Sequence, residues 1–110
     1  MSGRRYDLYG WRDLSLDEAA RRVERALSIR LEPRESTYRG GAYYAWDGDD
    51  GWPIAGELIV QANAPDDEGY LAEAEHPNHR TLLYASRVPD AWFEALSRTE
   101  GIELLASEVV

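Results

Sequence analysis

The chain has 110 residues, of which 44% are hydrophobic, which suffices for one packed core and is too few for two ordinary domains. It contains no cysteine, so disulfides and thiolate chemistry are excluded and a reducing, cytoplasmic location is favoured. The net charge of -9 is unevenly distributed, because residues 40–79 contain nine acids and no arginine. Such a segment repels nucleic acid and anionic lipid and favours a basic protein partner.

The first residues contain no apolar run, and no stretch of the chain is apolar for long enough to cross a bilayer. We therefore expect neither a signal peptide nor a membrane span. No internal repeat, low-complexity tract or linker interrupts the sequence. Residues 1–110 are accordingly predicted to form one domain.

The first two elements are predicted by alternation and by capping chemistry. Arg5 to Tyr9 alternates apolar and polar residues and indicates a short strand. Ser15 and Glu18 are spaced as a capping box, in which each side chain bonds the other residue's backbone amide. An apolar stripe follows at helical spacing, so a helix is predicted over residues 16–28.

Three strands are predicted in the middle of the chain. Residues 29–33 alternate and end at a proline, which is typical of an edge strand. The aromatic run at 42–46 and the apolar run at 54–62 are separated by a turn rich in Asp and Gly, and predict a hairpin.

The last elements follow a long stretch without clear periodicity, residues 63–80. Residues 81–86 are apolar on both faces, as in a central strand. Pro89 and Asp90 begin a helix predicted over residues 90–98, and 102–106 forms the last strand.

These elements predict an α+β domain with the order β-α-β-β-β-β-α-β. Its sheet is mostly antiparallel, with five or six strands and two helices packed on one face. The strands at 54–62 and 81–86 are expected to be central. The predicted core consists of Val23, Leu27, Leu58, Val60, Leu82, Tyr84, Trp92, Leu96 and Leu104.

Two motifs could hold a metal, and both fall short of a ligand set. The run DGDDG at 47–51 starts like a calcium loop, but the twelfth position is Leu58, which cannot coordinate, so a hairpin turn is favoured. His76 and His79 are three residues apart, but no cysteine or third histidine is present. We expect no bound metal or other cofactor.

Nucleophilic catalysis lacks its usual motifs, since there is no Cys and no GxSxG, and both histidines lie in one loop. The polar stretch at 34–41 could hold an anion through Arg34, Arg39 and the glycine amides but contains no phosphate-loop pattern, and surface ion pairing explains it as well. These patterns therefore favour a non-enzymatic role.

Aromatic residues beside clustered acids indicate a protein-binding patch, with aromatic anchors inside a charged rim. The predicted partner-binding residues are Trp46, Asp47, Asp49, Asp50, Trp52, Asp66, Asp67 and Glu68.

A capped first helix is followed by RESTYRGGAYY, by LIVQAN and by HPNHRTLLYAS. In this layout, which covers most of the chain, the sequence resembles small immunity-type proteins of bacterial polymorphic or contact-dependent toxin systems. The resemblance implies an α+β domain that binds and blocks one cognate toxin without chemistry of its own.

The leading hypothesis is thus a non-enzymatic inhibitor of a basic toxin such as a nuclease. The alternative is a small-ligand-binding domain or modest hydrolase that uses the loop at 63–80. Its ligand-binding residues would be Arg34, Arg39, Asn63, His76 and His79.

Overall fold

The structure, a computed structural model, describes residues 5–36, 41–47, 56–65 and 69–109. These residues form six strands and two helices in the predicted order, which confirms the α+β fold class. The bounds are β1 Arg5–Trp11, α1 Leu16–Leu27, β2 Glu32–Ser36, β3 Gly41–Asp47, β4 Glu57–Ala62, β5 Thr81–Ser86, α2 Asp90–Ser97 and β6 Glu103–Val109.

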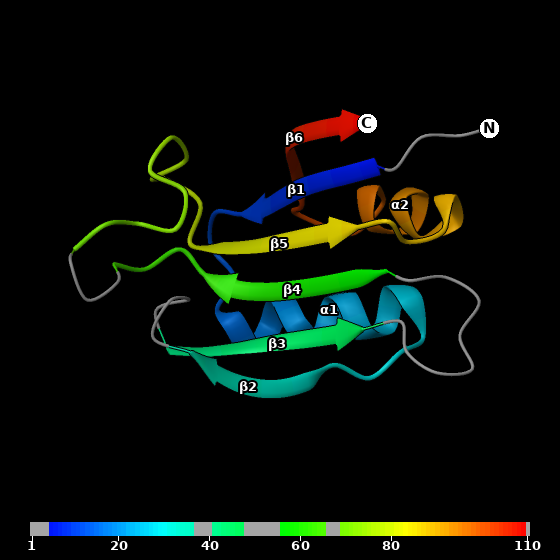
Figure 1. Cartoon of the computed structure of the whole chain (residues 1–110), viewed down its shortest axis with the longest axis horizontal. Helices are drawn as coiled ribbons and strands as arrows, with labels where there is room; N and C mark the ends of the chain where they lie inside the picture. The colour runs from blue at the N-terminus through cyan, green and yellow to red at the C-terminus, as the bar shows by residue number, and fades with distance from the viewer. Residues whose placement is uncertain (1–4, 37–40, 48–55, 66–68, 110) are drawn as a thin grey trace.

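The strands form one antiparallel sheet in the order β2-β3-β4-β5-β1-β6 (Figure 1). As predicted, β4 and β5 are central and β2 lies at an edge. The first and last strands of the chain pair with each other, so contacts between distant segments close the fold.

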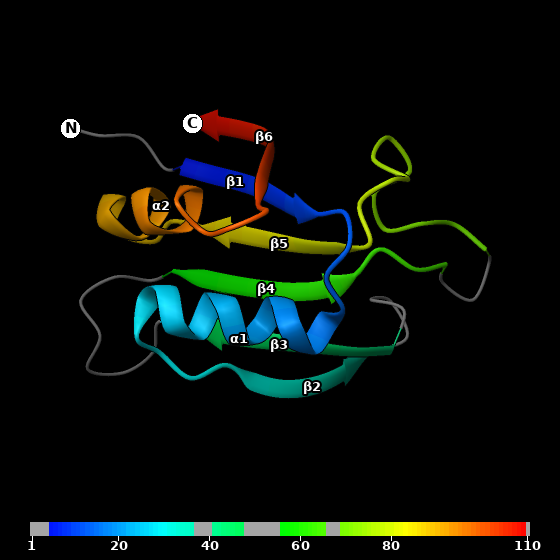
Figure 2. The same ribbon diagram turned by 180° about the vertical axis from the view of Figure 1, so that it is seen from behind.

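Both helices cover the same face of the sheet, as predicted (Figure 2). α1 begins with the capping box, in which the Ser15 hydroxyl accepts from the Glu18 amide at 3.3 Å. It ends at Ser28, whose backbone is left-handed with φ 55°. The buried stripe of α1 faces the sheet. None of the described helices combines the length and apolar character needed to cross a membrane.

The main core lies between this sheet face and the helices. Five predicted core residues belong to it, and a sixth packs against it from α2: Val23, Leu27, Leu58, Val60 and Leu96, with Trp92 at the periphery. Leu82 is buried and Tyr84 half-buried, but both lie on the opposite face of the sheet.

The prediction for Leu104 is wrong, because this side chain is 52% exposed. Its strand, β6, is an edge strand, and its pairing with β1 shifts in register between Leu8 and Tyr9. The neighbouring Leu105 instead packs beside Gly10. Gly10 belongs to the sheet face away from the helices, so Leu105 covers that face, and neither leucine enters the main core.

Several strand boundaries also differ from the prediction: β1 continues to Trp11, β2 to Ser36 and β6 to Val109. The strand predicted at 29–33 begins only at Glu32, because α1 holds the preceding residues: the Glu24 carbonyl accepts from the Ile29 amide and its carboxylate from the Leu31 amide. β4 is described from Glu57, and residues 54–55 of the predicted strand lie outside the described residues.

Candidate functional site

The sheet face opposite the helices, here called the open face, is the candidate site. Directly paired residues of antiparallel strands share a face, so the strand register identifies its members. No described helix crosses it (Figure 1). Its members are Tyr6, Leu8, Gly10, Glu32, Arg34, Ser36, Gly41, Tyr43, Ala45, Asp47, Glu57, Ile59, Gln61, Leu82, Tyr84, Ser86, Glu103, Ala106 and Glu108.

The centre of the open face is apolar and ringed by tyrosines. Ala45 and Ile59 are paired side by side and buried. Tyr6, Tyr43 and Tyr84 are half-buried around them. Tyrosine brings a large contact area and a polar tip with few rotatable bonds, and it is enriched among the residues that dominate binding energy.

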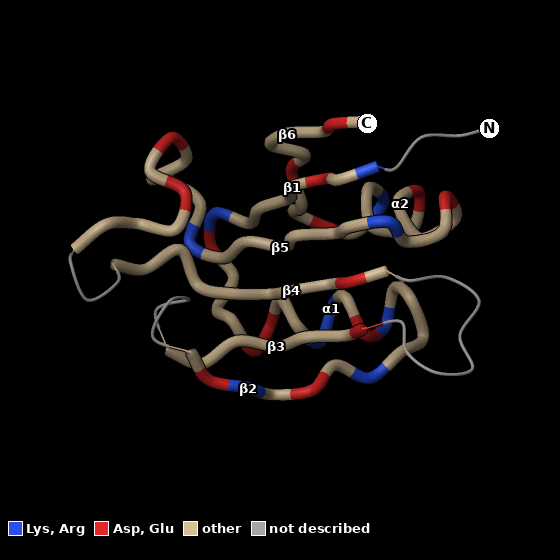
Figure 3. The backbone as a smooth tube through the Cα atoms, in the orientation of Figure 1, with Lys and Arg blue, Asp and Glu red and all other residues tan. Residues whose placement is uncertain are grey.

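One end of the open face carries a row of carboxylates. Asp47 of β3 lies directly opposite Glu57 of β4, and both are exposed (Figure 3). Farther along the row, the exposed Glu108 of β6 lies opposite Tyr6. Like charges directly opposite each other on neighbouring strands are destabilising. Stability alone therefore does not explain this row.

A single arginine partly neutralises the carboxylates on the β2 side. The Arg34 guanidinium lies 3.0 Å from the Asp47 carboxylate and 3.3 Å from that of Glu32. Its hydrogen bond to Asp47 raises the pKa of Arg34, which stays charged in any case. Glu57 and Glu108 have no ion-pair partner within the described ranges, so the row keeps a net negative charge.

At the opposite end of the sheet, Asn63 holds the 63–80 loop together. Its side-chain amide donates to the carbonyls of Glu73 and His76, and its side-chain oxygen accepts from the Glu73 amide. The Tyr84 hydroxyl donates to the Glu73 carboxylate at 3.1 Å, which ties the loop to the open face. Both polar groups of the Asn63 side chain are therefore hydrogen-bonded to the loop backbone.

His79 anchors the same loop at the β1–β6 side. Its ring is buried, and Nε2 lies 3.3 Å from the Glu103 carboxylate. Arg12 also bonds Glu103 at 2.8 Å, and this bond, with the contact to His79, lowers the pKa of Glu103. A Cβ at Gly10 would lie 3.1 Å from the His79 ring, so the absence of a side chain there makes room for it.

The predicted ligand-binding residues do not all lie together. His76 and His79 are neighbours, with ring centroids 6.0 Å apart, and Asn63 bonds the His76 carbonyl. Arg34 lies in a row that runs through Tyr43, Gln61 and Leu82 to Gly10, which is beside His79. Four strand spacings of about 4.8 Å separate Arg34 from Gly10, or about 19 Å. Arg39 lies outside the described residues.

Two of the predicted partner-binding residues are described. Asp47 belongs to the carboxylate row, whereas the Trp46 ring faces the helices and contacts Trp92, with centroids 4.8 Å apart. The others, Asp49, Asp50, Trp52, Asp66, Asp67 and Glu68, lie outside the described residues.

Sequence reasoning missed Tyr6, Tyr84, Glu57 and Glu108 as members of this face. The available signal was the pattern of β5, which is apolar on both faces although both helices cover only one. Within the described ranges, no three side chains of the metal-binding types His, Cys, Asp and Glu are grouped as a metal site would need.

Comparison with known protein families, with characterised proteins and with solved structures found no match to this chain. Its function is therefore inferred from the chemistry of the open face.

Proposed function

We propose that the chain is a non-enzymatic inhibitor that neutralises a basic protein, such as a toxin nuclease, by binding it with the open face. The observation that carries the proposal is the direct opposition of Asp47 and Glu57 beside an apolar, tyrosine-ringed centre. This pair costs folding stability, and a cationic partner would relieve the repulsion.

Each part of the open face has a role in binding. The tyrosines supply contact area at the centre, where most binding energy arises. The carboxylates of the row attract a basic partner over a distance and set its orientation, which raises the association rate at low salt. The acidic net charge of -9 reinforces this attraction and opposes direct binding to nucleic acid.

A nuclease is a suitable target because its substrate-binding surface must itself be cationic in order to hold phosphates. An acidic, aromatic face could cover such a surface and exclude the substrate. The proposal agrees with the resemblance to immunity-type proteins and with a cytoplasmic site of action.

The test compares two single charge reversals. Glu57→Lys changes the carboxylate row, and Glu94→Lys makes the same change on α2, where Glu94 is equally exposed and has no ion-pair partner within the described ranges. The original chain is immobilised, and a basic protein that it retains from an extract of the source cells is purified. The affinity of this protein for the original chain and for each immobilised variant is then measured by interferometry. We expect Glu57→Lys to weaken binding about tenfold or more and Glu94→Lys to leave it within about twofold.

The purified partner must also lose its activity when one equivalent of the chain is added, and binding by the original chain must weaken as salt rises. Equal affinity for Glu57→Lys and the original chain would contradict use of the open face. A partner that stays fully active in the complex would contradict inhibition.

The alternative of a small-ligand site in the 63–80 loop has less support. Asn63 uses its amide to hold the loop, and His79 is buried beneath it. Thermal shifts with a metabolite panel distinguish the two proposals, because a ligand binder is stabilised by its ligand and an inhibitor is not.

A further inference from the structure

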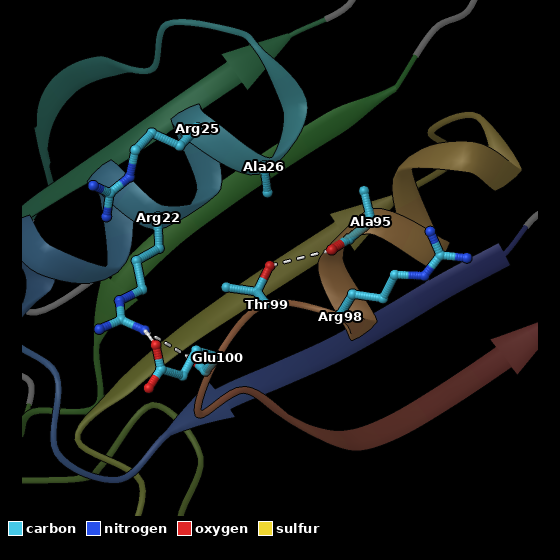
Figure 4. A pocket seen from close by; sticks show the side chains of 7 residues that line it. All are labelled: Arg22, Arg25, Ala26, Ala95, Arg98, Thr99 and Glu100. Carbon is cyan, nitrogen blue, oxygen red and sulfur yellow. Dashed lines mark hydrogen bonds and ion pairs between the residues drawn. The ribbon is translucent and has the colours of Figure 1, made fainter.

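A second surface, on the helical side of the molecule, has the opposite charge. Between α1 and α2 lies a groove of about 470 Å³ (Figure 4). Two alanines face each other across it, Ala26 from α1 and Ala95 from α2, and three arginines line it. This groove lies on the other side of the sheet from the open face, so a ligand there would not compete with the proposed partner.

The groove has more cationic than anionic groups. Arg25 and Arg98 are exposed, and their guanidinium groups have no ion-pair or hydrogen-bond partner within the described ranges. Arg22 donates to the Glu100 carbonyl at 3.1 Å and approaches its carboxylate at 3.5 Å. That carboxylate is 89% exposed, and among the described residues this long contact alone holds it, so an incoming carboxylate could replace it.

The shape of the groove favours an extended ligand. An adjoining hollow of about 230 Å³ shares Arg22 and Glu100 with it and continues toward Arg12. The side chains of Arg25 and Arg98 point away from each other, on opposite sides of the groove (Figure 4). A single small anion could not contact both guanidinium groups, whereas a chain with several separated carboxylates could.

We propose that the groove between α1 and α2 binds an extended acidic peptide segment of a partner protein. Carboxylates of the segment pair with Arg25, Arg98 and Arg22, and its aliphatic parts pack on the two alanines. Nucleic acid fits less well, because its phosphodiester backbone carries no aliphatic side chains to pack on Ala26 and Ala95.

The test uses fluorescein-labelled hexaglutamate as the probe and hexaglutamine as the uncharged probe, with binding followed by fluorescence anisotropy at low salt. The groove variant is Arg25→Glu with Arg98→Glu. The control, Arg30→Glu with Arg80→Glu, changes the net charge equally at two exposed arginines outside the groove. We expect the original chain to bind hexaglutamate and not hexaglutamine, with about tenfold loss in the groove variant and about twofold in the control.

Circular dichroism of both variants checks that they fold as the original chain does. Equal losses of affinity for hexaglutamate in the two double variants would show that overall charge attracts the probe, and would overturn the proposed site. Absence of hexaglutamate binding to the original chain would also overturn it. Displacement of the probe by inorganic phosphate as effectively as by free peptide, or tighter binding of oligothymidylate, would replace the acidic peptide with another anion.

Discussion

Asp7 is a buried carboxylate that joins three parts of the fold. It accepts two hydrogen bonds from Arg5, at 2.8 and 3.0 Å, one from the Tyr9 hydroxyl at 2.7 Å and one from Ser107 of β6 at 2.6 Å. Arg5 in turn lies 4.3 Å above the Phe93 ring of α2. Burial raises the pKa of Asp7, but these hydrogen bonds outweigh it, so its pKa lies below the ordinary value. Burial and the bond to Asp7 raise the pKa of Tyr9.

Asp7→Asn is predicted to destabilise the domain by about 2 kcal/mol near neutral pH, because a charge-assisted network loses its anion. The lowered folded-state pKa means that ionised Asp7 contributes its stability above the unfolded-state pKa of about 4. That contribution is lost as pH falls through the lower folded-state pKa. Urea denaturation should therefore show a difference between the variant and the original chain that shrinks toward about pH 3.

Glu75→Gln is the control, since it removes an exposed carboxylate that forms no ion pair in the described ranges. It should leave stability nearly unchanged at every pH. A difference for Asp7→Asn that stayed constant or grew on acidification would contradict the assigned ionised state.

The 63–80 loop is a long connection whose described part is ordered chiefly by one side chain. The Asn63 side chain makes three hydrogen bonds to the backbone of the loop. The backbone amide of Asn63 also donates to the Arg80 carbonyl, where the two ends of the loop meet. Bonds within a loop of few apolar contacts open more readily than those of a central strand.

Asn63→Ala is predicted to cost about 2 kcal/mol, because the Glu73 amide loses its partner and the Glu73 and His76 carbonyls each lose one of two hydrogen bonds. Amide hydrogen exchange should quicken at Glu73 and His79, while β4 and β5 stay protected. Asn78→Ala, an exposed substitution in the same loop, should change neither stability nor exchange. Unchanged protection in the Asn63 variant would show that the loop is held by other contacts.

At the scale of the molecule, the two proposed binding surfaces, both built from described residues, differ in charge. Carboxylates border the open face, and three arginines and one glutamate line the groove on the helical side. The sheet lies between these surfaces, so one chain could hold a basic partner on one side and an acidic segment on the other. Both proposals rest on this division of charge.

The carboxylate row should show a trade-off between stability and binding. Glu57→Lys places a cation opposite Asp47 in place of a like charge, so folding stability should rise by about 0.5 kcal/mol while affinity for the basic partner falls. Thermal and urea denaturation measure the first effect. Glu94→Lys, which has no cross-strand partner, should change neither quantity. A less stable Glu57→Lys protein would show that the row is not under electrostatic strain.

The sequence by itself determined the elements whose signals are local. The capping box at Ser15 and Glu18 and the stripe of α1 depend on contacts three or four residues apart, which any chain with this spacing can form. The alternation of the strands likewise predicted the fold class, the element order and the central place of β4 and β5.

Only the tertiary structure decided which residues make the open face. Tyr6, Glu57 and Glu108 are far apart in the chain and share a row because β4, β5, β1 and β6 pair in that order. Leu104 turns outward and Leu105 packs beside Gly10 at a register shift that no local pattern marks. Strand order and register are set by pairing between segments far apart in the chain. The residues that share a sheet face are therefore determined only when those segments pair and the helices cover the other face.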